Sequence, residues 1–146
     1  MRWTPRSGYE TLHGCIWLPR LLDKARRVAA GSGHLIDGEW MYGDNDFADG
    51  ILLRFLGVSD AKVVEIVRAQ SDDAAAGAQL LAIGGKTPAQ IAAFNRRFRL
   101  AAGAFMPLIE ADEGRAAPSP WTNALRALYN GVIAGPAIAV FKWMQR

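Results

Sequence analysis

One segment of the sequence places charged side chains at spacings that could bind an anion. Arg20 and Asp23 are three residues apart, and Asp23 and Arg27 are four apart, so on a helix one carboxylate would lie between two guanidinium groups. Such a carboxylate can orient arginines for bidentate binding of a second anion. The alternative is a ladder of surface ion pairs, which contributes little to stability. The candidate anion-binding residues are Arg6, Arg20, Asp23 and Arg27.

The other residues that could act in catalysis or bind a metal are too few to complete such a site. A structural zinc site uses four Cys or His ligands, and the chain has one Cys and two His. Gly84-Gly85-Lys86-Thr87 resembles the end of a phosphate-binding loop, but Leu80 occupies the position of that motif's first glycine. A nucleophilic pair of Cys15 and His34 would depend entirely on the fold. We therefore expect no catalytic residues, no metal and no cofactor.

Capping signals and apolar spacing predict helices along most of the chain. Thr87-Pro88-Ala89-Gln90 combines an N-cap threonine, an N1 proline and an N3 glutamine, and predicts a helix to about Gly103. Ser7-Gly8-Tyr9-Glu10 has the capping-box pattern and predicts a short helix that ends before Pro19. Residues 33–50 are expected to form a loop with at most one short extended piece. The fold class we expect is all-α, a compact bundle of about six to seven short helices with a C-terminal apolar helix. Further helix starts are expected at Pro19, Ser59-Asp60 and Ser71-Asp72-Asp73.

The charge distribution argues against a nucleic-acid-binding protein. The 146 residues carry 17 Lys and Arg against 14 Asp and Glu, but residues 1–120 contain 14 of each. The net charge of +3 therefore comes from Arg126, Lys142 and Arg146. The segment Phe94–Arg99 interleaves two phenylalanines with three arginines, and the phenylalanines, four residues apart, are expected to pack inward. We rank nucleic-acid binding well below a solvated helix face or a protein-contact surface.

Composition and the chain's first residues favour a folded cytoplasmic protein. A hydrophobic fraction of 51% excludes a disordered chain. The single cysteine fits a reducing compartment, and no secretory signal follows the N-terminal Met1-Arg2-Trp3. We expect the cytoplasm, or the cytoplasmic face of a membrane.

The last 26 residues differ from the rest and suggest a domain 1–120 followed by an apolar, cationic helix 121–146. No charged residue occurs from Ala127 to Phe141, a run of 15, whereas a spanning helix needs about 20 apolar residues. The segment could be a last core helix, which we favour slightly, a docking helix or a membrane anchor. Its candidate contact residues are Trp121, Leu125, Tyr129, Val132, Ile133, Phe141 and Trp143.

Several strings carry a family resemblance. Pro5-Arg6-Ser7-x-Tyr9-Glu10-x-Leu12-x-Gly14 and Leu18-Pro19-Arg20-Leu21-Leu22-Asp23-Lys24 are followed by Arg54–Val58 and Asp112–Arg115. Together they resemble an uncharacterised bacterial family, the domain of unknown function numbered 5069, over about residues 5–118. The resemblance implies a compact helical domain without an assigned activity, cofactor or catalytic residue.

Three hypotheses of function follow. The first is a small non-catalytic helical binding or accessory protein that contacts a protein partner or a larger assembly. The second is an anionic-metabolite binding domain or enzyme that uses the Arg/Asp cluster. The third is an accessory subunit attached to a membrane or a membrane complex through residues 121–146.

Overall fold

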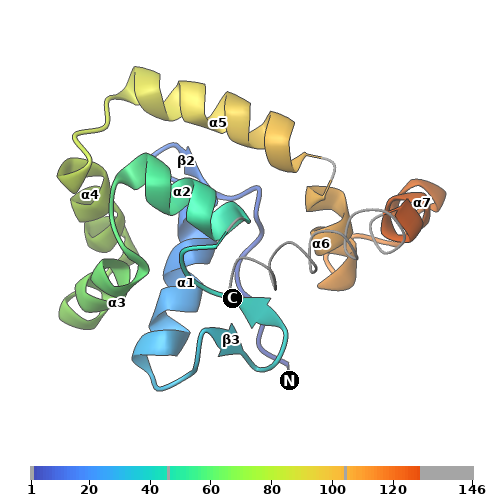
Figure 1. The fold of residues 1–146 in the computed structure, drawn as a ribbon, viewed down its shortest axis with the longest axis horizontal. Helices are drawn as coiled ribbons and strands as arrows, with labels where there is room; N and C mark the ends of the chain where they lie inside the picture. Colours follow the sequence, from blue (N-terminus) through green and yellow to red (C-terminus); the bar gives the residue numbers. More distant parts are fainter. Residues whose placement is uncertain (1, 46, 104, 129–146) are drawn as a thin grey trace, which may run out of the picture. The chain divides into compact units, whose positions relative to one another are not determined.

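The computed structural model describes residues 2–45, 47–103 and 105–128, and the chain divides into two units, Met1–Ala102 and Gly103–Arg146 (Figure 1). The described residues form seven helices and only four strands of two residues each. The prediction of a mostly helical fold is therefore confirmed. The boundary predicted after residue 120 is not tested by this division and stays a prediction.

The elements of the first unit are named in chain order. They are β1 (Thr11–Leu12), β2 (Cys15–Ile16), α1 (Leu18–Ala29), β3 (Leu35–Ile36), β4 (Trp40–Met41), α2 (Ala48–Leu56), α3 (Asp60–Ala69), α4 (Asp73–Ile83) and α5 (Pro88–Ala102). The second unit contains α6 (Met106–Asp112) and α7 (Pro120–Leu128).

Helix α1 is the central element of the first unit and packs against α3, α4, β1 and β3 (Figure 1). Its apolar stripe, spaced at three and four residues, is fully buried at Leu18, Leu21, Leu22 and Ala25. The predicted proline of the first turn is in place at Pro19, where the missing N–H is not needed. Because it touches so many elements, α1 positions the charged side chains described below.

Three predicted helix starts are confirmed by their cap hydrogen bonds. The Gln90 N–H donates to Thr87 Oγ1 at 3.2 Å, and the Thr87 N–H donates to Gln90 Oε1 at 2.9 Å, which completes a capping box at α5. Ser59 accepts from Lys62 N–H, and Asp72 accepts from the N–H groups of Ala74 and Ala75.

The helix predicted from Ser7 to Pro19 is wrong, because this segment forms the β1–β2 hairpin. Leu12 pairs with Cys15, so His13 and Gly14 make a two-residue loop. Their φ angles of 49° and 76° are both positive, as a type I′ hairpin turn requires. Gly14 readily adopts a positive φ angle, so this turn can form. The hairpin therefore forms in place of the helix that the capping-box pattern at Ser7 predicts.

A second hairpin, β3–β4, lies within the region expected to be a loop. Ile36 pairs with Trp40 on the buried side, and Leu35 pairs with Met41 on the exposed side. Two residues per strand are too few for apolar alternation to be visible in the sequence.

In the second unit α6 and α7 pack against each other. The Ser119 N–H donates to Thr122 Oγ1, and the Thr122 N–H donates to Ser119 Oγ. These two hydrogen bonds cap the start of α7. Arg126 of α7 forms an ion pair with Asp112 of α6. Among the residues described, no helix has the length and apolarity to cross a bilayer. The predicted C-terminal helix beyond Leu128 lies outside the described residues.

Candidate functional site

The predicted Arg/Asp cluster begins with a close pair between the N-terminal segment and α1. Arg6 Nε and Nη2 donate to the Asp23 carboxylate at 3.0 and 2.7 Å, and the Arg6 N–H donates to it at 2.7 Å. Arg6 Nη2 also donates to the Pro19 carbonyl at 3.1 Å. The pairing with Asp23 raises the pKa of the Arg6 guanidinium. This bidentate pair fixes the extended N-terminal segment on α1.

Two further residues close the cluster into a neutral network of two arginines and two aspartates. Asp73, the first residue of α4, accepts from Arg6 Nη2 at 2.5 Å and from Arg26 Nε at 2.8 Å. Arg26 also donates to the carbonyls of Val67 and Gln70, at the end of α3. The network therefore joins the N-terminal segment, α1, α3 and α4.

The remaining two predicted anion-binding residues make other contacts. Arg20 is buried, donates to the Arg6 carbonyl at 2.9 Å and lies over the Trp17 ring at 5.0 Å. Arg27 pairs with Asp37 at 2.8 Å and lies over the Trp3 ring at 5.0 Å. The structure thus brings Arg6, Arg20 and Asp23 together and directs Arg27 elsewhere. An anion at Arg6 would have to displace a carboxylate, and anion binding there stays a prediction.

A buried ion pair that the sequence analysis missed lies next to Arg20 on α1, where Arg20 and Lys24 both lie over the Trp17 ring. Lys24 Nζ donates to both carboxylate oxygens of Asp49 at 2.5 Å and to the Met41 carbonyl at 3.1 Å. Trp17 Nε1 donates to the same carboxylate at 2.8 Å. The side chains of Lys24 and Asp49 are only 5% and 2% exposed. The signal in the sequence was the position of Lys24 three residues after Leu21, which places it beside the apolar stripe of α1.

The cysteine and the histidines do not form a catalytic pair in the structure. Cys15 is buried in β2, and its Sγ contacts the Ile16 carbonyl. His34 lies against the Tyr42 ring and 3.3 Å from the Asp60 carboxylate. His13 contacts the Ala74 carbonyl at 2.7 Å. Within the described ranges, no three His, Cys, Asp or Glu side chains gather as metal ligands would.

The two predicted contact residues that the structure describes lie on α7. Trp121, Leu125 and Leu128 follow one another at four and three residues, so they share one face of this helix. Trp121 is 67% exposed and Leu128 is 51% exposed. The other five candidates, Tyr129, Val132, Ile133, Phe141 and Trp143, lie outside the described residues.

The fold and the network define a small, mostly helical domain whose clustered charges connect its elements. The family described as "Domain of unknown function (DUF5069)" matches residues 2–107, and the chain belongs to this family. The match covers α1 to α5 and every residue of the Arg6–Asp23–Asp73–Arg26 network. No curated protein and no solved structure matches the chain.

The network predicts an acid-sensitive contribution to stability from Asp73. Burial raises the pKa of this carboxyl group, but hydrogen bonds and charges from Arg26 and Arg6 outweigh burial and lower the pKa below its usual 3.8. The stabilisation is therefore complete above the unfolded pKa and is lost as the pH falls through the lowered folded pKa. Asp73→Asn should cost about 1–3 kcal/mol near pH 7 and less at lower pH. Urea unfolding of both proteins from about pH 7 to about pH 2 measures the difference.

The matched control is Asp37→Asn, which removes an exposed carboxylate that pairs with Arg27. A loss of stability from Asp73→Asn that stays constant across this pH range would contradict the assigned role.

A second prediction concerns the thiol of Cys15. Burial raises its pKa to about 12, so almost no thiolate exists near neutral pH. We expect the folded protein to react with a thiol reagent at least about 100-fold more slowly than the urea-unfolded chain, in which the pKa returns to about 8.5. Stopped-flow absorbance with a chromogenic disulfide measures both rates. Equal rates would show that the thiol is accessible in the folded state.

Proposed function

We propose that this protein is a small non-catalytic helical protein that contacts a protein partner, as an accessory component of a larger assembly. The observation that carries the proposal is the apolar face of α7, with Trp121 and Leu128 both more than half exposed. Exposed apolar faces mark interaction sites, and tryptophan is enriched among the residues that dominate binding energy.

The sequence extends this face beyond the described part of α7. Tyr129, Val132 and Ile133 continue the spacing of Leu125 and Leu128, and no charge interrupts the run to Phe141. An uncharged run with this spacing is typical of the amphipathic segments that fill an apolar groove on a partner.

The arrangement of the titratable groups supports contact over catalysis. Asp23 and Asp73 are held by arginines, and Asp49 is buried against Lys24. Carboxylates that are paired in this way hold helices and strands together and are not presented to a substrate. We propose the cytoplasm as the location, on the ground of the single, buried thiol.

The test is native purification from the source cell in mild detergent, comparing the full chain with a chain that lacks residues 121–146. We expect a stoichiometric complex with the full chain and its loss with the shortened chain. Unfolding by urea of the shortened chain checks that the first unit is intact. An unchanged monomer with the full chain would contradict the proposal, and sedimentation with membranes after a salt wash would favour membrane attachment in its place.

A further inference from the structure

Helix α5 carries a concentrated positive charge. Arg96, Arg97 and Arg99 are exposed, and none of them forms an ion pair among the residues that the structure describes. No acidic residue occurs between Pro88 and Ala102. The first unit holds 13 Lys and Arg and 11 Asp and Glu, so without these three arginines its net charge would be −1. The positive excess of the unit therefore lies on the exposed part of one helix.

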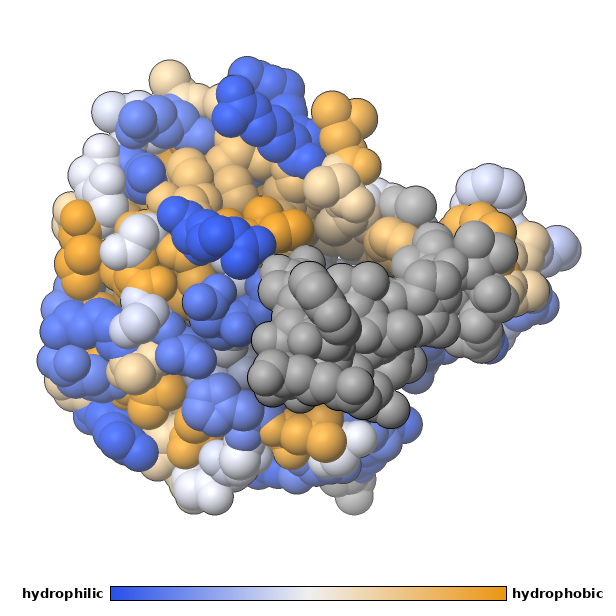
Figure 2. Space-filling model, viewed as in Figure 1, coloured by the Kyte–Doolittle hydropathy of each residue, from blue (hydrophilic) through white to orange (hydrophobic). Residues whose placement is uncertain are grey.

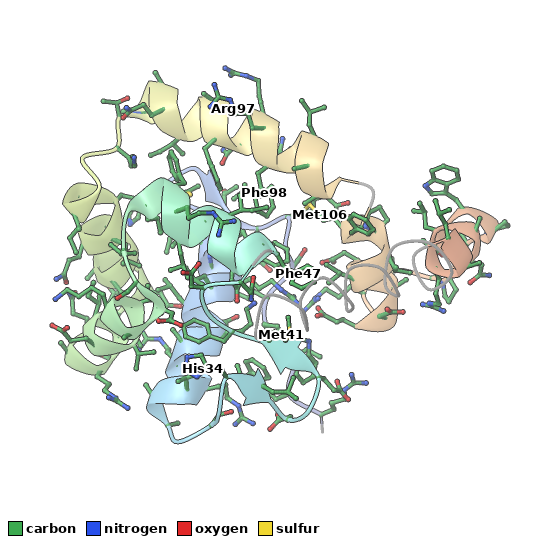
Figure 3. All side chains as sticks on the ribbon, viewed as in Figure 1. His34, Met41, Phe47, Arg97, Phe98 and Met106 are labelled. Carbon is green, nitrogen blue, oxygen red and sulfur yellow. The ribbon has the colours of Figure 1, made fainter. Side chains whose placement is uncertain are left out.

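Two of the arginines, Arg96 and Arg99, lie on the same part of the helix as an exposed leucine. Ile91, Phe94 and Phe98 are buried and define the inner face of α5. At 100° per residue, Arg96 and Leu100 lie on the opposite face. Figure 3 shows Phe98 on the inner side of α5, and Arg97 lies on the flank between the two faces. Leu100 is 86% exposed.

The N-terminal half of the same face carries small side chains. Ala89 and Ala92 are exposed and lie on the side of Arg96. Along the upper edge of Figure 2, where α5 lies, a strongly hydrophilic group stands next to a hydrophobic one. We call this surface the α5 outer face, made up of Ala89, Ala92, Arg96, Arg99 and Leu100.

We propose that the α5 outer face binds an acidic, amphipathic segment of a partner protein. Carboxylates of such a segment would pair with the guanidinium groups, which bind carboxylates in bidentate geometry. An apolar residue of the segment would cover Leu100, and the alanines would let its backbone approach. This surface belongs to the first unit and is separate from the apolar face of α7, so the proposal goes beyond the function proposed above.

The same observations disfavour nucleic acid as the occupant. Phe94 and Phe98 are buried, so the aromatic rings interleaved with the arginines cannot stack on bases. A protein that binds the phosphate backbone of nucleic acid depends on many phosphate contacts, whereas this face has two cations. A phosphate backbone has no apolar group that could cover Leu100, whereas an amphipathic peptide has one.

Fluorescence anisotropy with labelled probes tests the proposal on the full chain. The probes are a peptide with Glu and Leu at helical spacing, a peptide in which Ser replaces each Leu, and a single-stranded RNA. We expect the Glu/Leu peptide to bind most tightly at physiological salt. Arg96→Glu with Arg99→Glu should weaken its binding about tenfold or more, because like charges then face each other. Leu100→Ser should remove the preference for the Glu/Leu peptide over the Glu/Ser peptide.

The matched control is Arg54→Glu with Arg68→Glu, which reverses two exposed charges on α2 and α3. The control should change the affinity for the Glu/Leu peptide by no more than about twofold, because these charges lie outside the α5 outer face. Unfolding by urea confirms that all variants are folded. The proposal is overturned by tighter binding of the RNA, by equal weakening in the control, or by no saturable peptide binding up to about 1 mM.

Discussion

Replacing Asp49 with asparagine is expected to lower the free energy of unfolding by about 3–5 kcal/mol, because removing one partner of a buried ion pair leaves an uncompensated charge. Because asparagine is nearly the same size as aspartate, the loss in the free energy of unfolding measures the contribution of the charge and its hydrogen bonds. The Lys24 ammonium group would lose the carboxylate that it contacts at 2.5 Å through both oxygens. Urea unfolding followed by far-ultraviolet circular dichroism measures the change.

The control for this prediction is Asp44→Asn, which neutralises an exposed carboxylate paired with Arg54. Its effect should stay within about 0.5 kcal/mol. Replacing the buried pair together, Lys24→Met with Asp49→Leu, should recover part of the stability that Asp49→Asn loses. A loss below about 1 kcal/mol for Asp49→Asn would show that water or another group compensates the Lys24 charge.

Truncating Phe98 to alanine is the second change with a large expected effect, about 3–5 kcal/mol. The side chain is 1% exposed, and its ring lies 5.5 Å from both Trp17 and Phe94, measured between centroids. Phe94 in turn stacks on Phe55 of α2 at 4.2 Å. The cavity would therefore form where α5 packs on the rest of its unit.

Leu100→Ala is the matched control on the same helix. Because Leu100 is 86% exposed, its truncation should change the free energy of unfolding by no more than about 0.5 kcal/mol. Urea unfolding followed by tryptophan fluorescence measures both variants. Similar losses for the two would contradict the assignment of Phe98 to the inner face.

Local signals in the sequence predicted the helices well. The first N–H groups of a helix have no partner within the helix, and side chains at its start accept their hydrogen bonds. This is the case at Ser59, at Asp72 and at the Thr87–Gln90 capping box, so a few adjacent residues decide where a helix begins. The apolar stripe of α1 was equally visible, because burial repeats at the helical period.

The hairpins were harder to predict, because a turn of two residues decides them. The loop of β1–β2 depends on the positive φ of His13 and Gly14, and the strands themselves are too short to alternate. The capping-box pattern at Ser7 predicted a helix there, because the sequence analysis did not identify His13-Gly14 as a turn.

The partners in the charged cluster depend on contacts that are distant in the sequence. Asp73 lies 67 residues after Arg6 and still accepts its hydrogen bond. Helical spacing alone assigned Arg27 to Asp23, whereas the β3–β4 turn brings Asp37 to Arg27. Intervals of three and four residues identify neighbours on one helix and carry no information about other elements.

The measurement that tests the proposed function most directly is native mass spectrometry of the purified complex. Trp121→Ala with Leu128→Ser removes the apolar face of α7, and Leu35→Ser with Met41→Ser removes the exposed apolar pair of the β3–β4 hairpin. If α7 is the contact surface, the first pair releases the partner and the second leaves the stoichiometry unchanged. Release by the hairpin pair alone, or by neither pair, would contradict a contact through α7.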